Sequence, residues 1–486
     1  MNPILVIGAG PVGLTMALEL ARFGVPLRLV DRSAQATQTS RALVLWARTL
    51  ELMERSGCTG DFLEHGLRAA RASVRSGAEV LGAVRFDELP GSYNFGLMLP
   101  QSETERLLIR RLELLGVRVE REVELRGLQD DGDQVVARLR HADGSESSVA
   151  APWLLGCDGA HSTVRHALGI AFAGETENDD WLLADVRLEG DRAPPRDEAA
   201  ICLHRDGPLA MFPMRGKRTR VVGRIGPSDP QRPRAEPTLA DVQALIDQRA
   251  GGGFRAVDPV WLANFRINER MVDEYRHGRV LLAGDAAHIH SPAGGQGMNT
   301  GMQDAINLAW KLALVIHGAA RPTLLDSYSA ERARVGAMVV RNATRLTRAA
   351  KLSNPLLRAT RNGAIRWLLR LRGVRRAMAG MLSEIDIDYR QSTLSCGPHA
   401  GERVPPEHYA GPPPGQVAPR FIVHAADAAR GDALAARHPE LLEPRTRAPL
   451  ERRPLSIVRP DGYIGFVAGA DEWDAAGAWL QELGTT

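Results

Sequence analysis

A glycine-rich turn between a strand and a helix opens the chain and restricts its fold more than any other feature. The apolar run Ile4–Ile7 is followed by Gly8-Ala9-Gly10-Pro11-Val12-Gly13. An apolar-periodic stretch then extends to Gly24, and a second apolar run ends at Asp31, 18 residues after Gly13. The order strand, G-x-G-x-x-G, helix, strand and acid predicts a parallel βαβ unit that binds a dinucleotide.

Each glycine of this motif has its own physical role. Gly8 permits the tight turn, Gly10 lets the backbone approach a pyrophosphate, and Gly13 lets the helix pack on the strand. The helix N-terminus offers N–H donors to phosphate oxygens. Asp31 is expected to accept from ribose hydroxyls, and Arg32 beside it is a further cofactor-binding candidate. The motif does not separate NAD from FAD, and the alternative is a glycine-rich turn in an unrelated βαβ unit.

Length and charge exclude several classes of function. The 486 residues predict about three domains, and they suffice for a large core without disulfides or metals. With 61 basic and 58 acidic residues, the net charge of +3 argues against a dedicated nucleic-acid-binding protein.

The cysteines and the apolar runs indicate the compartment. Cys58, Cys157, Cys202 and Cys396 form no CxxC or zinc-type spacing, which predicts free thiols, a reducing compartment and no metal site. No secretory or membrane-spanning segment is recognisable. We therefore expect a cytoplasmic protein without integral membrane association.

Two later segments repeat the pattern of a buried strand that ends in glycine and aspartate. One strand leads into Cys157-Asp158-Gly159, and a helix is expected to begin near Ser162. Another strand, residues 280–283, ends at Gly284-Asp285. After Pro292 comes a glycine-rich turn, residues 294–297, and then an apolar-periodic helix that runs to about Val315.

In this order, the three motifs resemble those of the class A flavoprotein aromatic hydroxylases, the p-hydroxybenzoate hydroxylase superfamily. The matches are G-x-G-x-x-G at Gly8, C-D-G-x-x-S-x-x-R at 157–165 and G-D-A-A-H…P-x-G-G-Q-G-x-N-x-G at 284–301. The resemblance covers residues 3–395, and the long extension after it is similar to the branch of phenol hydroxylases and polyketide-tailoring hydroxylases. It implies an α/β fold with a Rossmann-like FAD-binding domain, an inserted β-sheet substrate domain and a C-terminal thioredoxin-like domain.

The resemblance implies side chains that hold FAD. Asp285 would accept from the ribityl hydroxyls, and Asp158 belongs to a motif that serves both FAD and the nicotinamide reductant. Arg41 would contact the flavin and pyrophosphate and is the side chain to which we assign a catalytic role. Gln101 would contact FAD, and Leu125 would offer backbone groups to the adenine. The alternatives are a surface arginine at a helix start for Arg41 and a helix residue without a ligand for Gln101.

The resemblance also assigns backbone groups at the reacting part of the flavin. Pro292 and Gly295 would act there through their backbone, and Gly297 would let the chain approach the pyrimidine edge. The helix that follows would direct its positive end at flavin N1 and O2, with amides from Met298 and Asn299. Such an arrangement stabilises an anionic reduced flavin by up to about 1–2 kcal/mol.

Two histidines and a cysteine near these motifs invite other interpretations. His288 and His290 follow Asp285 closely, but an i, i+2 pair beside a strand end is more typical of structural residues than of metal ligands. Cys157 is interpreted as a small buried hydrophobic residue and not as a catalytic thiol.

Residues 170–275 are predicted to alternate short strands with turns. Strands at 199–205, 208–214 and 218–225, with turns at 206–207 and 215–216, predict a β meander. In the family such a sheet holds the substrate. Which alternate side chains point inward stays open, and no aspartate–tyrosine pair for substrate deprotonation is recognisable. The substrate candidates are Cys202, His204, Met211, Phe212 and Pro213.

The last third of the chain contains a basic helical segment, a linker and a small unit. Residues 345–384 combine leucines with many arginines, which indicates either a membrane-surface helix or, as the resemblance favours, solvated helices that cover the FAD domain. Residues 396–419 are rich in proline and glycine and predict a linker. Strands at 421–423, 455–458 and 463–467 and a helix at 472–483 follow without CxxC, which indicates packing or dimerisation and not thiol chemistry. The arginines in question are Arg358, Arg361, Arg366, Arg370, Arg372, Arg375 and Arg376.

The resulting hypothesis is an FAD-dependent monooxygenase. NADPH or NADH would reduce FAD, and O₂ would form a flavin C4a-hydroperoxide that hydroxylates a phenolic or polycyclic polyketide substrate. The expected domains are FAD binding at 1–170 and 276–395, with 70–100 on the substrate side, a substrate domain at 171–275 and a C-terminal unit at 396–486, in a monomer or homodimer. The alternatives are a halogenase, whose W-x-W-x-I-P motif is absent, an antibiotic-inactivating monooxygenase, and a flavin-binding pathway partner that does not hydroxylate.

Overall fold

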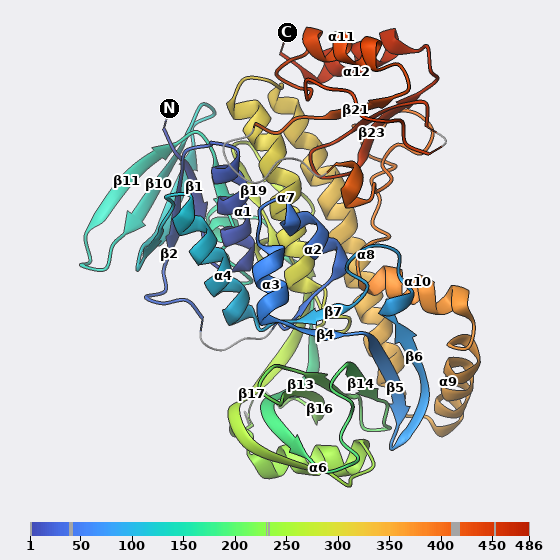
Figure 1. Cartoon of the computed structure of the whole chain (residues 1–486). Helices are drawn as coiled ribbons and strands as arrows, with labels where there is room; N and C mark the ends of the chain where they lie inside the picture. The colour runs from blue at the N-terminus through green and yellow to red at the C-terminus, as the bar shows by residue number, and fades with distance from the viewer. Residues whose placement is uncertain are drawn as a thin grey trace.

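The computed structural model describes residues 2–37, 42–229, 231, 234–409, 418–451 and 453–485. Figure 1 shows a central body of helices and parallel strands, a second sheet at one end and a C-terminal unit at the other. Ser40 and Arg41 lie outside the described residues, so the catalytic role assigned to Arg41 stays a prediction.

The central body is built on a six-stranded sheet of described residues. Its order is β18 (Arg276–His277), β19 (Val280–Leu282), β12 (Leu154–Gly156), β1 (Ile4–Ile7), β2 (Leu27–Asp31) and β8 (Val119–Arg121). All pairings are parallel except that of β18 with β19. This confirms the parallel βαβ unit. Because β1, β12 and β19 are neighbours, the three glycine motifs that follow them meet at one edge of the sheet.

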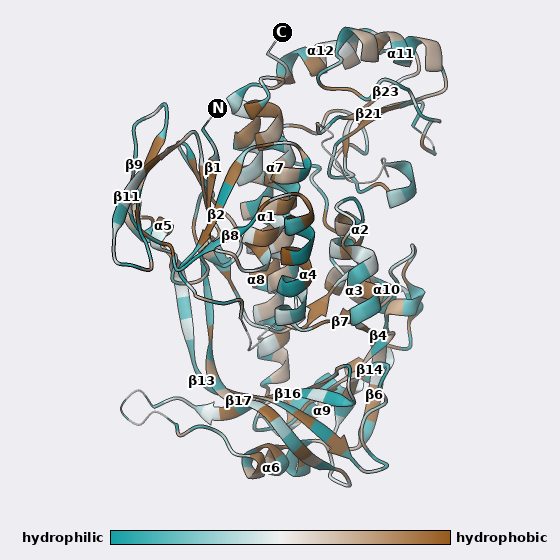
Figure 2. Ribbon diagram, turned by 60° about the vertical axis from the view of Figure 1, so that its left-hand side comes forward, coloured by the Kyte–Doolittle hydropathy of each residue, from teal (hydrophilic) through white to brown (hydrophobic). Residues whose placement is uncertain are grey.

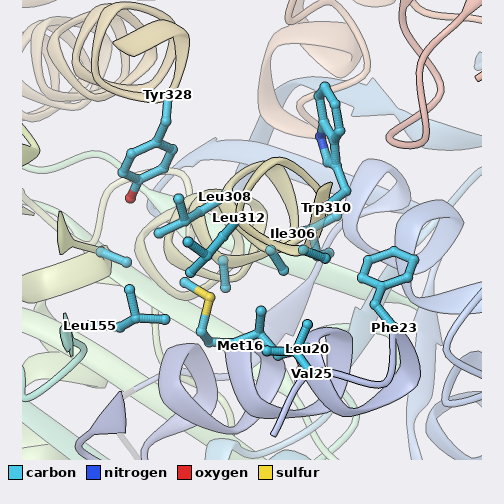
Figure 3. Close-up of a cluster of buried hydrophobic side chains, with 14 of the residues drawn as sticks. Met16, Leu20, Phe23, Val25, Leu155, Ile306, Leu308, Trp310, Leu312 and Tyr328 are labelled. Atoms are coloured by element: carbon cyan, nitrogen blue, oxygen red, sulfur yellow. The ribbon is translucent and has the colours of Figure 1, made fainter. Parts of the chain in front are cut away.

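Four helices accompany this sheet: one packs on β1 and β2, two pack against that helix, and one contacts β18. They are α1 (Pro11–Arg22), α4 (Gln101–Leu114), α7 (Gly297–Ile316) and α8 (Asp326–Ala350). Figure 3 shows the apolar layer in which Met16 of α1 faces Leu308 and Leu312 of α7. The hydroxyl of Tyr328 on α8 donates to the carbonyl of Leu282, 2.6 Å away, and so ties α8 to β19. Figure 2 shows the hydrophobic colouring concentrated on α1 and α7, whereas α4 is mostly hydrophilic.

Smaller elements complete this body. Helices α2 (Ala47–Glu54), α3 (Thr59–His65) and α5 (Thr163–Ala167) connect the strands. One antiparallel sheet has the order β11 (Glu146–Ala151), β10 (Val135–Arg140) and β9 (Glu124–Asp130). Another has the order β3 (Val44–Leu45), β7 (Gly96–Met98) and β4 (Leu67–Ala69). Ser162 caps α5 by accepting from the amide of Arg165, which confirms the helix start predicted near Ser162.

The second large sheet has eight strands among the described residues. The order is β20 (His288–Ile289), β17 (Arg255–Met271), β13 (Ala173–Glu189), β16 (Arg218–Pro227), β15 (Leu209–Pro213), β14 (Glu198–Cys202), β5 (Arg71–Ser76) and β6 (Glu79–Arg85). The antiparallel order β14, β15, β16 confirms the β meander. Residues of the first hundred join this sheet, because β5 pairs in parallel with β14.

Two features of this sheet differ from the prediction. Strands β13 and β17 are 17 residues long, not short, and the register shifts between them break the period of two that a long strand would otherwise show. Helix α6 (Leu239–Arg249) was not predicted. Its start carries a capping box in which Thr238 and Asp241 bond each other's backbone amides, a local signal that sequence reasoning had available.

Beyond α8 the chain forms α9 (Pro355–Leu368) and α10 (Arg372–Leu382), which pack beside β6. Short 3₁₀ turns lie at Phe86–Glu88, Gly284–Ala286, Pro322–Leu325 and Pro406–His408. Within the described residues, no helix combines the length and the apolar character needed to cross a bilayer.

The C-terminal unit is a three-stranded antiparallel sheet covered by two helices. Strands β21 (Ile422–Ala425), β22 (Leu455–Val458) and β23 (Ile464–Ala468) and helix α12 (Trp473–Leu483) confirm the predicted elements, whereas α11 (Ala428–Arg437) was not predicted. Residues 396–409 of the predicted linker lie along β23 and the turn before it. Cys396 donates to the carbonyl of Gly465, and Gly401 donates to that of Ile464.

Candidate functional site

The first glycine-rich turn is packed so closely that only glycine fits at two of its positions. A Cβ at Gly8, where φ is +98°, would lie 2.5 Å from the carbonyl oxygen of Cys157. One at Gly13 would lie 1.8 Å from the carbonyl oxygen of Gly8, whereas one at Gly10 would meet no described atom within 4 Å. Gly10 is the N-cap of α1, and no described side chain caps that helix. A side chain at Gly10 would therefore point into open space at the N-terminus of α1, where helix amides can donate to a phosphate.

Asp31 holds this turn against the end of β2. Its Oδ2 accepts from the amide of Ala9 at 2.6 Å. The carbonyl of Asp31 accepts from the amide of Val123 at 3.0 Å, so the chain that leads into β9 lies beside it. Leu125 is buried on β9, and Arg32 is exposed. The carboxylate of Asp31 thus lies at the mouth of the turn.

The polar side chains of the second motif, residues 157–165, bond within their own loop and to the third motif. The carboxylate of Asp158 accepts from the hydroxyl of Ser162 at 2.5 Å and from the amide of Thr163 at 2.7 Å. Burial raises the pKa of Asp158. Arg165 donates to the carbonyl of Ala286 at 3.0 Å and so joins this turn to the third motif. Asp158 therefore stabilises its own loop through these hydrogen bonds. Its contact with a cofactor stays a prediction.

The third motif places Asp285 beside α1. A Cβ at Gly284 would lie 2.6 Å from Val12 Cγ2, and one at Gly301 would lie 2.7 Å from the same atom. The turn at Gly284 therefore packs directly on the first helical turn of α1. Asp285 is exposed there, at the end of β19 and next to the glycine-rich turn of β1.

A buried charge network that the sequence analysis missed supports this turn from behind. Asp304 on α7 accepts from the amide of Gly284 at 3.0 Å, from Nε2 of His288 at 2.8 Å and from Nε of Arg332 at 2.6 Å. Burial alone would raise the pKa of Asp304, but Arg332 and His288 outweigh it and lower that pKa. His288 is thus a structural residue, as predicted. Among the described residues, no cluster of His, Cys, Asp and Glu could hold a metal ion.

The turn before α7 is clamped to strand β3. The amide of Gly295 donates to the carbonyl of Pro292 at 2.9 Å. Asn299 accepts from the amide of Trp46 at 2.8 Å and donates to the carbonyls of Val44 and Gly295 at 2.8 and 3.1 Å. The side chain of Asn299 therefore positions the turn, a role that is additional to the backbone contact predicted for it.

The N-terminus of α7 presents polar groups that lack a partner in the described part of the chain. The helix begins at Gly297 without a side-chain cap, so its first amides, including that of Met298, are available to an acceptor. Nε2 of His290 and Oε1 of Gln296 are buried and have no hydrogen-bond partner among the described residues. Burial lowers the pKa of His290 to about 4, so its imidazole is neutral. A polar ligand at this helix end would satisfy such groups.

Gln101 begins α4 near the undescribed residues 38–41. Its side-chain amide donates to Oε1 of Glu105 at 2.9 Å, and Oε2 of Glu105 accepts from the amide of Thr37 at 3.2 Å. Burial raises the pKa of Glu105. Glu105 therefore holds both the side chain of Gln101 and the backbone of Thr37 in the loop after β2. The cofactor contact predicted for Gln101 stays a prediction.

The substrate candidates divide between the two faces of the second sheet. Cys202 and Met211 are buried in the cluster that contains residues of α6, and their role as substrate residues stays a prediction. Phe212 lies on the opposite face and packs in the cluster that contains Trp46. Pro213 shares the parity of Met211, because successive side chains of a strand alternate between faces. His204 follows β14, and its Nδ1 accepts from the amide of Asp206 at 3.3 Å.

A buried ion pair lies on the same face as Phe212. Arg220 is the cross-strand partner of Phe212 and donates to both carboxylate oxygens of Asp185, at 2.8 and 2.7 Å. It also donates to the carbonyl of Ala42 at 3.4 Å. This pair was not among the predicted candidates, because nothing local in the sequence separates it from the many surface arginines.

Comparison with known proteins decides the family. The family model described as FAD binding domain matches residues 1–343. The chain is 38% identical over 455 residues to 6-methylpretetramide 4-monooxygenase of Streptomyces rimosus, which covers 91% of this chain and 78% of that protein. It is 34% identical to pentachlorophenol 4-monooxygenase of Sphingobium chlorophenolicum over 83% of this chain and 75% of that protein. The chain belongs to the FAD-dependent aromatic monooxygenases.

Solved structures agree with this family. The anhydrotetracycline hydroxylase OxyS of Streptomyces rimosus is 31% identical and superposes with a TM-score of 0.81 over 100% of both chains. CabE, an aromatic hydroxylase from angucycline biosynthesis, is 31% identical with a TM-score of 0.79 over 99% of both chains. The monooxygenase described here therefore has the fold of flavoprotein hydroxylases along its whole length, which confirms the predicted class A resemblance.

The site of this monooxygenase fits FAD on the geometry of its own residues. The open space at Gly10 lies at one helix N-terminus and the uncapped start of α7 at another. Asp31 stands at the end of β2 and Asp285 at the end of β19, on either side of β12 and β1 at the same edge of the sheet. Two helix ends for anionic groups and two carboxylates for hydroxyl groups are the recognition elements that a dinucleotide with ribose and ribityl chains requires.

Proposed function

We propose that this monooxygenase uses NADPH or NADH and O₂ to hydroxylate a polycyclic aromatic polyketide or a related phenol. The observation that carries the proposal is the likeness over the whole chain to hydroxylases named for anhydrotetracycline and angucycline biosynthesis. Bound FAD would supply the chemistry, which is reductive activation of O₂ and delivery of one oxygen atom to the ring. The protein would have to bind FAD and the substrate, orient the substrate ring toward the flavin and exclude water.

The proposed roles of the residues follow from their places. The turn at Gly8 and Gly10 would hold the pyrophosphate at the start of α1, with Asp31 and Arg32 toward the adenosine ribose and Leu125 toward the adenine. Asp285 would accept from the ribityl hydroxyls. A carboxylate that accepts a hydroxyl contributes about 1.5–3 kcal/mol per hydrogen bond. Together these contacts would anchor one half of the cofactor.

The other half would lie at the turn before α7. The backbone of Pro292, Gly295 and Gly297 would approach the flavin, and the amides of Met298 and Asn299 would donate to its pyrimidine edge. The helix end would stabilise negative charge there by up to about 1–2 kcal/mol. We keep the proposed cofactor contacts of Arg41, Gln101 and Asp158 as part of this assignment.

The substrate would lie against the face of the second sheet that carries Phe212. On this face Phe212 offers an aromatic surface and the Arg220–Asp185 pair offers charge-assisted hydrogen bonds. Aromatic rings prefer offset or edge contacts with such a side chain. We propose the FAD domain at 1–170 and 276–395, the substrate domain at 171–275 with 70–100 beside it, and a thioredoxin-like C-terminal domain in a cytoplasmic monomer or homodimer.

Substrate-dependent oxidation of NADPH tests the proposal. The holoenzyme would be supplied with NADPH or NADH, O₂ and a panel of phenols, naphthoquinones and polycyclic polyketides. We expect O₂ consumption to rise with a polycyclic phenol and the product to gain one oxygen atom by mass. NADPH oxidation that no aromatic compound stimulates would refute the hydroxylase assignment.

A second candidate is a flavin-binding catalyst that does not hydroxylate. It is favoured by the likeness to the Diels-Alderase PyrE3, which is 28% identical with a TM-score of 0.77 over 100% of this chain and 99% of that one. Antibiotic inactivation is a related option, since the chain is 36% identical to a rifampicin monooxygenase of Streptomyces venezuelae over 70% of both chains. An isomerised product formed without O₂ would favour the first of these, and an oxygenated rifamycin the second.

A further inference from the structure

Helix α9 and the turn after it carry an apolar stripe that faces outward. The stripe consists of Leu356, Leu357, Trp367, Leu368 and Leu371, and we call it the outer stripe. Leu356 is 74% exposed and Trp367 is 61% exposed. Of the eight large hydrophobic side chains that are exposed among the described residues, the outer stripe accounts for five. Single exposed leucines are ordinary, but a concentration of this kind indicates a binding surface.

The phase of the helix explains the exposure. Leu356 and Leu357 lie eleven residues, or about three helical turns, before Trp367 and Leu368, so these four residues lie on one face of α9, and Leu371 follows in the turn after the helix. The opposite face is the one that packs on the protein. There Ile365 and the buried Leu369 contact the cluster beneath, and Leu369 lies against Gly82 of β6 so closely that a Cβ at Gly82 would be 2.8 Å from its Cβ. The stripe is therefore a second apolar face that the fold leaves uncovered.

Ion pairs fix this orientation. Arg366 of α9 donates to Glu79 at 2.6 Å. Arg375 of α10 donates to Glu88 at 2.7 Å and to the carbonyl of Leu369, just after α9, at 3.1 Å. No residue of α9, all of which is described, is buried. In Figure 1, α9 lies at the outer edge of the molecule beside β5 and β6. The helix is thus held with the outer stripe turned to the solvent.

The charge around the stripe identifies its occupant. Residues 353–383 contain seven arginines and no acidic residue. Arg370 and Arg372 are exposed next to the stripe, and neither has an ion-pair partner in the described part of the chain. A second copy of this chain that docked face to face would bring the same arginines together, and like charges would repel. An anionic surface with an apolar interior matches both features.

We infer that α9 and its outer stripe bind an anionic phospholipid surface. Leucine and tryptophan side chains would enter the boundary between headgroups and acyl chains, and Arg370 and Arg372 would lie at the phosphates. The helix would lie in the plane of the interface, in line with the absence of any membrane-spanning helix in the described residues. Association of this kind is peripheral and reversible.

Flotation of the full-length holoprotein with vesicles tests the inference. The vesicles contain equal parts of phosphatidylglycerol and phosphatidylcholine, and vesicles of phosphatidylcholine alone serve as the comparison. We expect binding to the anionic vesicles at low salt, weakened as salt screens the arginines. Absence of binding to the anionic vesicles at low salt would overturn the inference.

Two variants and their matched controls separate the apolar from the ionic contribution. The triple variant Leu356→Ser, Trp367→Ser, Leu371→Ser should bind at least about tenfold more weakly, and Arg370→Gln, Arg372→Gln roughly fivefold more weakly per arginine. The controls are Leu114→Ser, 70% exposed on α4, and the exposed pair Arg110→Gln, Arg118→Gln, which should bind as the parent does. Equal binding by the triple variant would overturn the inference.

The oligomeric state of the protein in the absence of lipid shows whether a second copy of the chain covers the outer stripe. A monomer, or a dimer that the triple variant leaves intact, supports the lipid surface as the occupant of the stripe. A dimer that the triple variant converts to a monomer would show that a second copy covers the stripe, and would overturn the assignment to lipid. Light scattering of the parent and the variant distinguishes these outcomes.

Discussion

The carboxylate of Asp304 accepts a 2.6 Å hydrogen bond from the guanidinium of Arg332, and both side chains are fully buried. The second oxygen of Asp304 accepts from the amide of Gly284, the residue before Asp285. One buried ion pair between α7 and α8 therefore positions the turn that carries the proposed ribityl ligand. The buried carboxylate of Asp304 thus holds the backbone of Gly284 and so positions the exposed carboxylate of Asp285.

Replacement of Asp304 by asparagine should destabilise the protein strongly. The variant leaves Arg332 buried with its charge uncompensated, which costs about 3–5 kcal/mol of unfolding free energy. Denaturant unfolding of the holoprotein measures this loss. The matched control is Asp326→Asn, which removes the partner of Arg276 at an ion pair where Asp326 is 69% exposed and should cost less than about 1 kcal/mol. Equal losses in the two variants would contradict the role assigned to the buried pair.

Glu384 should make stability depend on pH. It is fully buried, and its carboxylate accepts from the hydroxyl of Thr300 at 2.7 Å and from the side-chain amide of Gln303. Burial raises its pKa to about 7 from the ordinary 4.5. The folded state therefore favours the protonated acid, and the contribution of Glu384 to stability is full below pH 4.5 and is lost as the pH rises to about 7.

Comparison of the parent with Glu384→Gln isolates this effect. The neutral amide cannot ionise, so the unfolding free energy of the variant relative to the parent should rise by up to about 3 kcal/mol between pH 4.5 and 8. Unfolding of both proteins at these two pH values gives the difference. A difference that does not change with pH would contradict the raised pKa.

Removal of the Asp285 carboxylate should weaken FAD binding without a large change in folding. Asp285 is exposed, and each charge-assisted hydrogen bond it makes to a ribityl hydroxyl is worth about 1.5–3 kcal/mol. Asp285→Ala should therefore lower the affinity of the apoprotein for FAD by roughly 10- to 150-fold. Quenching of FAD fluorescence on titration measures it. Asp273→Ala, an exposed aspartate ahead of β18, serves as the control and should bind FAD as the parent does.

The parts of the site that could be identified from the sequence are those whose motif lies within a short stretch of the chain. Gly13 is required by a contact within one turn and Gly8 by its positive φ as well as by the distant carbonyl of Cys157, and Asp31 and Asp285 stand at the ends of apolar strands. Each of these signals fits within a few residues. The sequence could therefore predict the parallel sheet, the glycine turns and the flavin family.

The parts that it missed depend on partners far along the chain. Asp304 and Arg332 are 28 residues apart, and no spacing rule joins them. Strand β15 reads Leu-Ala-Met-Phe-Pro, which is apolar at every position, so alternation could not separate Met211 from Phe212. Only the position of α6 shows which face is covered. The face of a uniformly apolar strand is decided by its tertiary neighbours.

The C-terminal unit should be required for the stability of the FAD-binding body, because it supplies Arg459. This guanidinium donates to both carboxylate oxygens of Glu331 on α8, at 2.7 and 3.0 Å, and all of these groups are buried. In Arg459→Met, Glu331 would keep Lys311 as its cationic partner, at 2.8 Å. Lys311 is itself a weak substitute, since burial lowers its pKa to about 8.

We expect Arg459→Met to lose about 3–5 kcal/mol of stability. The loss should be larger above pH 8, because Lys311 of the parent is then neutral and removal of Arg459 no longer relieves a repulsion between the two cations. Thermal unfolding of the holoprotein at pH 7 and 9 measures both effects. Arg430→Met removes the partner of Asp471, which is 94% exposed, and should change stability by less than about 1 kcal/mol at either pH. If Arg459→Met unfolded at the same temperature as this control, the C-terminal unit would not stabilise the body through Glu331, and its packing would have to rest on the apolar contacts alone.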